Sequence, residues 1–179
     1  SLGKNLPVDV VDRFIQLNKW GVPEDTHKFL LKKNLVPVIE KIVNKLKFDA
    51  KYIGTFFGHY MKFVEGHFTP ASDFSYERVY EMFEFIKKQK LEVEIAREML
   101  PVVYEHPQMD FDSVLTIINF KKRDKEELLA LIGFLREKFK ETGRKQTKKN
   151  ESDWVMGQLR KQAVGNMNLK ELHKNINKN

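Results

Sequence analysis

Cysteine is absent from the 179-residue chain. This absence excludes disulfides, thiolate nucleophiles, zinc ribbons and iron–sulfur centres, and it fits an intracellular protein. Long apolar runs are missing as well, because the longest one, 128–135, has eight residues whereas a membrane span needs about 20. The first residues, Ser-Leu-Gly-Lys-Asn-Leu-Pro, contain no hydrophobic region of a signal peptide. The sequence therefore predicts a cytoplasmic protein without a membrane partner.

Motifs for catalysis and cofactor binding are also missing. The five histidines form no H-E-x-x-H pair, and no G-x-S-x-G, Walker A or G-x-G-x-x-G element occurs. Glu92, Glu94 and Glu98 are interpreted as a solvated acidic face, because general acid–base work needs a pocket that nothing here predicts. Gly54 and Gly58 form a G-x-x-x-G pattern that indicates close helix packing. We therefore expect no catalytic residue, no metal site and no cofactor within this chain.

Positive charge is in excess, and the excess lies at one end of the chain. The formal net charge is +7. Residues 1–112 carry 16 Lys and Arg against 17 Asp and Glu, whereas residues 113–179 carry 16 against 8. A segregated basic end is typical of a protein that binds a polyanion, most simply nucleic acid. The alternative is a solvated basic surface without such a partner.

Apolar residues recur at helical spacing along the chain and strict alternation is scarce, which predicts an all-α fold. We expect a larger N-terminal helical subdomain over residues 1–119 and a basic three-helix tail over residues 120–179. In the first part, Pro101 is expected to kink or break its helix, since proline removes a backbone hydrogen bond. Asp112 is expected to cap a short helix over 113–118.

The tail contains three sets of helix-start signals. The residues expected to cap its helices are Asp124, Ser152 and Asn168. Glu127 and Glu171 stand three residues after the first and third of these, as a capping box requires. Residues 136–149 carry seven Lys and Arg against two Glu. The second half of this stretch is predicted to form an exposed and mobile connection between the first two tail helices, with the joint between about residues 140 and 150.

Two glycines mark the last two predicted helices. Gly157 lies inside a helix, where glycine costs about 1 kcal/mol relative to alanine, so close helix contact or close approach of a ligand backbone must compensate. Gly165 is predicted to end that helix as its C′ residue. Helix N-termini at Ser152 and Asn168 offer backbone donors to phosphates. The residues that we expect to bind nucleic acid are Lys145, Lys148, Lys149, Arg160, Lys161, Asn168, Lys170 and Lys174.

The spacing of these residues resembles the C-terminal tail of the GatB/YqeY family. The resemblance rests on Val155-Met156-Gly157, followed by Lys161, Gly165 and Asn168. The family comprises the tail domains of glutamyl-tRNA(Gln) amidotransferase, in its GatB-type and archaeal GatE-type forms, together with free-standing YqeY proteins. One departure is Asn166, which occupies a turn position that is often basic in the family.

This resemblance implies a tRNA-binding tail that positions mischarged tRNA for ATP-dependent transamidation during protein biosynthesis. The reaction belongs to a carbon–nitrogen ligase that uses glutamine as amide donor. The family's ATP- and magnesium-binding cradle would precede Ser1, so we expect a piece of a longer protein that meets the other amidotransferase subunits through the missing part. The alternative is a free-standing YqeY-like helical adaptor that binds protein rather than tRNA.

Overall fold

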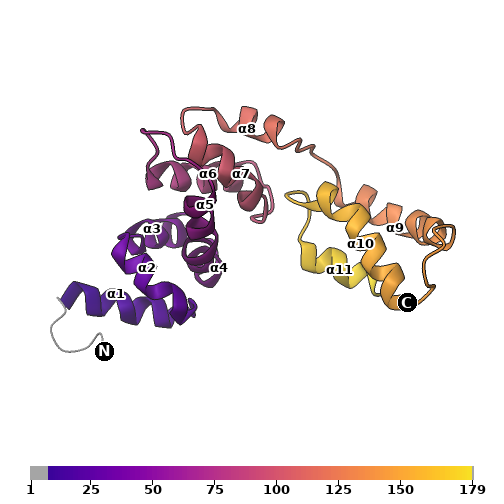
Figure 1. Cartoon of the computed structure of the whole chain (residues 1–179), viewed down its shortest axis with the longest axis horizontal. Helices are drawn as coiled ribbons and strands as arrows, with labels where there is room; N and C mark the ends of the chain where they lie inside the picture. The colour runs from indigo at the N-terminus through magenta and orange to yellow at the C-terminus, as the bar shows by residue number, and fades with distance from the viewer. Residues whose placement is uncertain (1–7, 179) are drawn as a thin grey trace.

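The computed structural model describes residues 8–178, and over this range it is all-α, without a strand, as the sequence predicts (Figure 1). The helices of the N-terminal part are α1 Val8–Lys19, α2 His27–Lys32, α3 Val36–Leu46, α4 Ala50–Thr55, α5 Lys62–His67, α6 Tyr76–Lys88, α7 Ile95–Glu105 and α8 Phe111–Ile117. A 3₁₀ turn over Glu24–Thr26 precedes α2, and a π-helical segment over Phe56–Met61 joins α4 to α5. The tail helices are α9 Lys125–Lys140, α10 Lys148–Ala163 and α11 Leu169–Ile176.

Two hydrophobic clusters hold the helices together. The larger extends from Leu17 to Val114 and unites the N-terminal helices. The smaller extends from Leu128 to Ile176 and joins α9, α10 and α11, which Figure 1 shows as a group of their own. The buried members of the two clusters are different residues, because each set of amphipathic helices buries its apolar faces internally. Phe120 and Val164, both in the predicted tail, pack against the larger cluster.

Local hydrogen bonds explain several helix ends. Asn168 caps α11 as predicted, because its Oδ1 accepts the backbone N–H groups of Lys170 at 2.9 Å and Glu171 at 3.1 Å. Asp49 caps α4 in the same way, by accepting the N–H group three residues further on. Gly165 follows α10 with a φ of 85°, in the left-handed region that glycine adopts at a C′ position.

Helix α10 begins one turn earlier than predicted. Thr147, and not Ser152, is its N-cap, because the Thr147 hydroxyl accepts the backbone N–H of Asn150 at 3.1 Å. The first turn of α10 is polar, so apolar periodicity does not mark its start. The connection between α9 and α10 is 141–147, which lies within the interval of about 140 to 150 predicted for the joint.

Two further helix starts differ from the prediction in their caps. Asp110, and not Asp112, caps α8, because its carboxylate accepts the backbone N–H of Ser113 at 3.0 Å. Asp124 does precede α9, but its side chain makes no capping hydrogen bond, so the predicted capping box with Glu127 is wrong. In both cases an aspartate lies in the turn before the helix, as the sequence predicts. Side-chain geometry decides whether its carboxylate accepts a capping hydrogen bond.

Helix α7 continues through Pro101 instead of breaking there. Proline has no N–H, so the carbonyl group of Arg97, four residues earlier, loses its usual donor. The hydroxyl of Tyr60 replaces it, donating to the Arg97 carbonyl oxygen at 2.5 Å. A side chain 37 residues away thus satisfies the group that the proline leaves free.

The glycines of the G-x-x-x-G pattern allow close helix packing, as predicted. A Cβ at Gly54 would stand 2.3 Å from Cγ2 of Val22, and one at Gly58 would stand 2.5 Å from Cβ of Thr26. Both distances are far below van der Waals contact. Only glycine therefore lets α4 and the π-helical segment approach the chain that leads into α2.

Candidate nucleic-acid interface

The turn between α10 and α11 is fixed to the segment that links the two helical groups. Asn166 donates through Nδ2 to the carbonyl oxygens of Lys121 at 2.8 Å and Gln162 at 2.9 Å. Its Oδ1 accepts the backbone N–H of Arg123 at 2.9 Å. The position that the family resemblance marks as often basic is therefore a structural hydrogen-bonding residue in this chain.

Gly165 brings the same turn against the N-terminal part. Its carbonyl oxygen accepts the backbone N–H of Glu92 at 2.9 Å. A Cβ at this position would stand 2.9 Å from the Phe120 ring and 3.1 Å from Ile95. Glycine is required here both by the positive φ and by this close approach.

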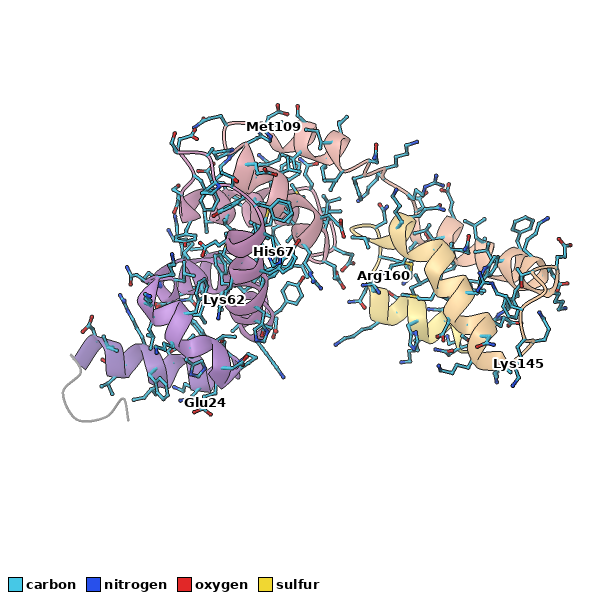
Figure 2. The ribbon with its side chains drawn as sticks, in the orientation of Figure 1. Glu24, Lys62, His67, Met109, Lys145 and Arg160 are labelled. Atoms are coloured by element: carbon cyan, nitrogen blue, oxygen red, sulfur yellow. The ribbon has the colours of Figure 1, made fainter. Side chains whose placement is uncertain are left out.

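These contacts bring together basic residues that are distant in the sequence. The junction cluster, as we name it, consists of Lys121, Lys122, Arg123, Arg160 and Lys161, all of them exposed. Arg160 and Lys161 precede Gln162, whose carbonyl shares the Asn166 amide with that of Lys121. Figure 2 shows Arg160 on the side of the tail that faces the N-terminal helices.

The described ion pairs of the tail involve cations outside the junction cluster. Ion pairs engage the tail cations Lys125, Arg136, Lys138, Lys140 and Lys149. Within residues 8–178, no member of the junction cluster has an ion-pair partner. The exposed cations of the junction cluster, at the end of α10 and in residues 121–123, are therefore open to a bound anion.

Acidic groups lie beside part of the cluster. Burial raises the pKa of Glu92, and the neighbouring carboxylates of Glu94 and Glu171 raise it further, whereas Lys125 and Lys122 oppose the rise. Lys125 is ion-paired with Glu171. Lys122, a member of the junction cluster, thus lies near the carboxylate of Glu92.

A groove runs between α7, the end of α8 and α10. Its volume is about 340 Å³, and its lining residues are Ile95, Glu98, Ile118, Asn119, Phe120, Gly157, Arg160, Lys161 and Val164. We call it the junction groove. Gly157 is exposed in it, and a Cβ there would meet no atom of the described chain within 4 Å. Close helix contact, the first of the two explanations for this glycine, is thus ruled out within residues 8–178.

The predicted nucleic-acid-binding residues fall into separate groups. Arg160 and Lys161 line the junction groove. Lys170 and Lys174 are exposed one turn apart on α11, on one helix face. Asn168 lies between these groups, and its side chain is engaged as the α11 cap.

The other three predicted residues stand at the opposite end of α10. Lys145 lies in the connection before α10, and Lys148 and Lys149 begin the helix. Lys149 is paired with Asp153 at 3.7 Å. Because a helix rises about 1.5 Å per residue, Lys149 and Lys161 are about 18 Å apart along the axis. The structure therefore does not bring this group to the junction groove.

Sequence reasoning missed Lys121, Lys122 and Arg123 as candidate site residues. The signal was present as a run of three cations directly before the Asp124 cap. Its significance depends on Asn166, which holds the run beside α10 from 43 and 45 residues away in the sequence. Only the folded chain shows this pairing.

Other kinds of site find no support in the part of the chain that the structure describes. No group of three or more His, Cys, Asp or Glu side chains among residues 8–178 could hold a metal ion. No helix in that range has the length and apolar character of a membrane span. His27 is buried, with Nε2 bonded to the carbonyl oxygen of Val22 at 2.8 Å, and His59 is paired with Asp25 at 3.0 Å.

Comparisons with known proteins add no relative. No family model, no curated protein and no solved structure matches the chain. The resemblance to the GatB/YqeY tail therefore stays a prediction that rests on the spacing of Gly157, Lys161, Gly165 and Asn168. The geometry of the junction is independent of that resemblance.

Proposed function

We propose that this chain is a non-catalytic tRNA-binding tail that holds folded tRNA at the junction groove. The observation that carries the proposal is the junction cluster, whose five cations lack ion-pair partners within residues 8–178. Two of them, Arg160 and Lys161, line a groove together with the open Gly157. Cations of this kind bind phosphates and release counterions. Gly157 supports the proposal because its missing side chain leaves space for a ribose–phosphate backbone.

The way in which the cluster is held favours a folded RNA over a flexible strand. The backbone of Lys121 and Arg123 is fixed to the α10–α11 turn, so the spacing of the cations is set by the fold. Contacts with phosphates at fixed spacing select the shape of a duplex, because the deep major groove of RNA hides its base edges. Lys170 and Lys174 extend this positive surface along α11.

In this proposal the chain belongs to a GatB/YqeY-type component of a cytoplasmic glutamyl- or aspartyl-tRNA amidotransferase, a ligase of protein biosynthesis. ATP and magnesium would bind in a separate N-terminal part, where the other subunits would also attach. The role of this chain is then to position the mischarged tRNA, and it needs no reactive side chain of its own.

Binding of folded tRNA over a range of salt concentrations tests the proposal. For roughly three to five phosphate contacts, the log–log slope of affinity against salt should be about −3 to −4. The double variant Arg160→Glu with Lys161→Glu should bind more weakly and lose about two units of that slope. Both residues are exposed, so the helices should remain folded by circular dichroism.

A matched control makes the same change of net charge elsewhere. Lys32→Glu with Lys33→Glu alters exposed residues at the end of α2 and should leave both affinity and slope nearly unchanged. A single variant, Lys145→Glu, measures non-specific attraction by the α9–α10 connection. Equal affinity for folded tRNA and for an unstructured strand of the same length, insensitive to the groove variants, would contradict the proposal.

A further inference from the structure

A second cavity lies on the N-terminal part, and its lining residues all belong to that part. Its volume is about 450 Å³, within the range of small-ligand sites. The residues that line it are Tyr52, Thr55, Phe56, His59, Tyr60, Phe63 and Arg97. We call it the aromatic cavity, because five of these seven residues carry planar rings.

A π-helical segment contributes to the wall of this cavity. The π-helix over Phe56–Met61 interrupts the run from α4 to α5 and contributes three of the lining residues. Such segments are rare in proteins and are frequent at functional sites, since the wider turn changes the direction of successive side chains. The local irregularity thus coincides with the aromatic lining.

The rings at its edge form a ladder of stacked groups. Tyr60 and Phe63 are nearly parallel, at 15°, with centroids 5.9 Å apart. Phe63 in turn stacks on His67, with centroids 4.1 Å apart. The guanidinium carbon of Arg97 lies 4.7 Å from the centre of the Tyr60 ring. Phe63 is nevertheless 47% exposed, so this ladder presents apolar ring surface to solvent.

The charge around the cavity favours a planar anion. Arg97 and His59 are its ionisable nitrogen groups, and His59 is paired with Asp25 at 3.0 Å. No carboxylate is among the lining residues. Arg97 has no ion-pair partner in the described part of the chain. Ring faces next to a guanidinium group suit a nucleotide, which combines a flat base with a phosphate. They suit a cationic or acidic peptide side chain less well.

Tyr52 adds an unused hydrogen-bond donor. Its hydroxyl is buried and has no hydrogen-bond partner among residues 8–178. Burial raises the pKa of Tyr52 to about 12, and the nearby Glu94 adds to the rise while Arg97 opposes it, so the hydroxyl keeps its proton. A buried donor without a partner costs free energy that a hydrogen-bond acceptor would remove.

The aromatic cavity adjoins the junction groove. Arg97 lines the cavity, and the next residue, Glu98, lines the groove together with Ile95. Consecutive residues of a helix point about 100° apart, so the first turns of α7 separate the two sites. Residues of one helix, α7, therefore line both sites.

We propose that the aromatic cavity receives an unpaired nucleobase of the bound RNA, which packs against Tyr60 and Phe63 while Arg97 faces its phosphate. This inference rests on the proposed tRNA binding and adds a second type of contact to it. The junction cluster binds phosphates of folded RNA, whereas the cavity binds one base that is free of pairing.

Adenosine 5′-monophosphate is the first probe, added to the full chain and followed by amide chemical shifts. We expect shifts at Tyr60, Phe63 and Arg97 that saturate, and none with ribose 5-phosphate, which lacks the base. Phe63→Ala should weaken nucleotide binding by at least about fivefold, the lower end of what one stacked base contributes. Phe134→Ala is the matched control, because Phe134 is 58% exposed on α9 and also lies near a lysine.

A conservative variant separates stacking from folding. Phe63→Leu keeps an apolar side chain but removes the ring, so it should also weaken nucleotide binding while the thermal unfolding curve stays close to that of the wild type. With folded tRNA, Phe63→Ala should reduce affinity without changing the salt slope, because stacking releases no counterions. The groove variant Arg160→Glu with Lys161→Glu should leave binding of the mononucleotide unchanged.

Several outcomes would overturn the inference. No shift with the nucleotide, or equal shifts with ribose 5-phosphate, would show that no base is bound. Tighter binding of N-acetyl-tryptophanamide than of the nucleotide would make the cavity a site for an aromatic side chain of a protein. Nucleotide binding that Phe63→Ala abolishes, with no effect of that variant on tRNA, would indicate a site for free nucleotides. Failure of the proposed function is distinct, since wild-type chain would then not bind tRNA at all.

Discussion

Replacing Gly157 by alanine tests whether the open face of α10 is used by a ligand. The change should stabilise the tail by about 1 kcal/mol, because alanine is the better helix former. No atom of the described chain lies within 4 Å of the new methyl group, so no clash opposes the gain. If an RNA backbone approaches this face, the same methyl group should weaken tRNA binding by at least about fivefold, or about 1 kcal/mol.

Gly133 provides the matched control for this experiment. It is an exposed glycine inside α9, and a Cβ there also meets nothing within 4 Å. Gly133→Ala should therefore give the same gain in stability with unchanged tRNA affinity. Gly58→Ala marks the opposite case, because its Cβ would stand 2.5 Å from Thr26. Overpacking of this kind costs about 1–3 kcal/mol, so this variant should be destabilised.

Thermal or urea unfolding measures the stability of the three glycine variants, and a filter-binding titration measures their affinity for tRNA. The decisive comparison is between Gly157→Ala and Gly133→Ala. If both variants gain stability and both bind tRNA like the wild type, the open face of α10 is not where RNA approaches. That result would remove the main argument for Gly157 as a functional position.

Two further variants probe the junction and a buried hydroxyl. Asn166→Ala should lose three hydrogen bonds, and its free energy of unfolding should fall by about 1–3 kcal/mol. The backbone amide of Arg123 should then exchange its hydrogen faster, and unchanged exchange would refute the role of Asn166. Since folding raises the pKa of Tyr52 from 10.0 to about 12, its contribution to stability is present below pH 10 and is lost as the pH rises toward 12. Tyr52→Phe has no hydroxyl to ionise, so, allowing for partial exposure, the fall in its free energy of unfolding between about pH 9 and about pH 11 should be smaller by about 1 kcal/mol. Urea midpoints at about pH 9 and about pH 11 test this, and equal pH dependence in both proteins would contradict it.

The sequence alone determined the helical class and much of the tail. Apolar spacing and local stop signals suffice for this, because helices form from contacts three and four residues apart. Gly165 and Asn168 act as the C′ residue and the N-cap that their residue types indicate. The same local reasoning failed at Thr147, since the polar first turn of α10 gives no apolar signal.

Only the tertiary structure decided what the chain brings together. Pro101 does not break α7, because the hydroxyl of Tyr60 supplies the missing donor from 37 residues away. The run at Lys121 joins Arg160 through the amide of Asn166, a contact that no local pattern encodes. Such pairings depend on which backbone groups meet after the two hydrophobic clusters form. The candidate site was therefore half predictable: its α10 cations follow from the tail motif, and its remaining cations follow from the fold.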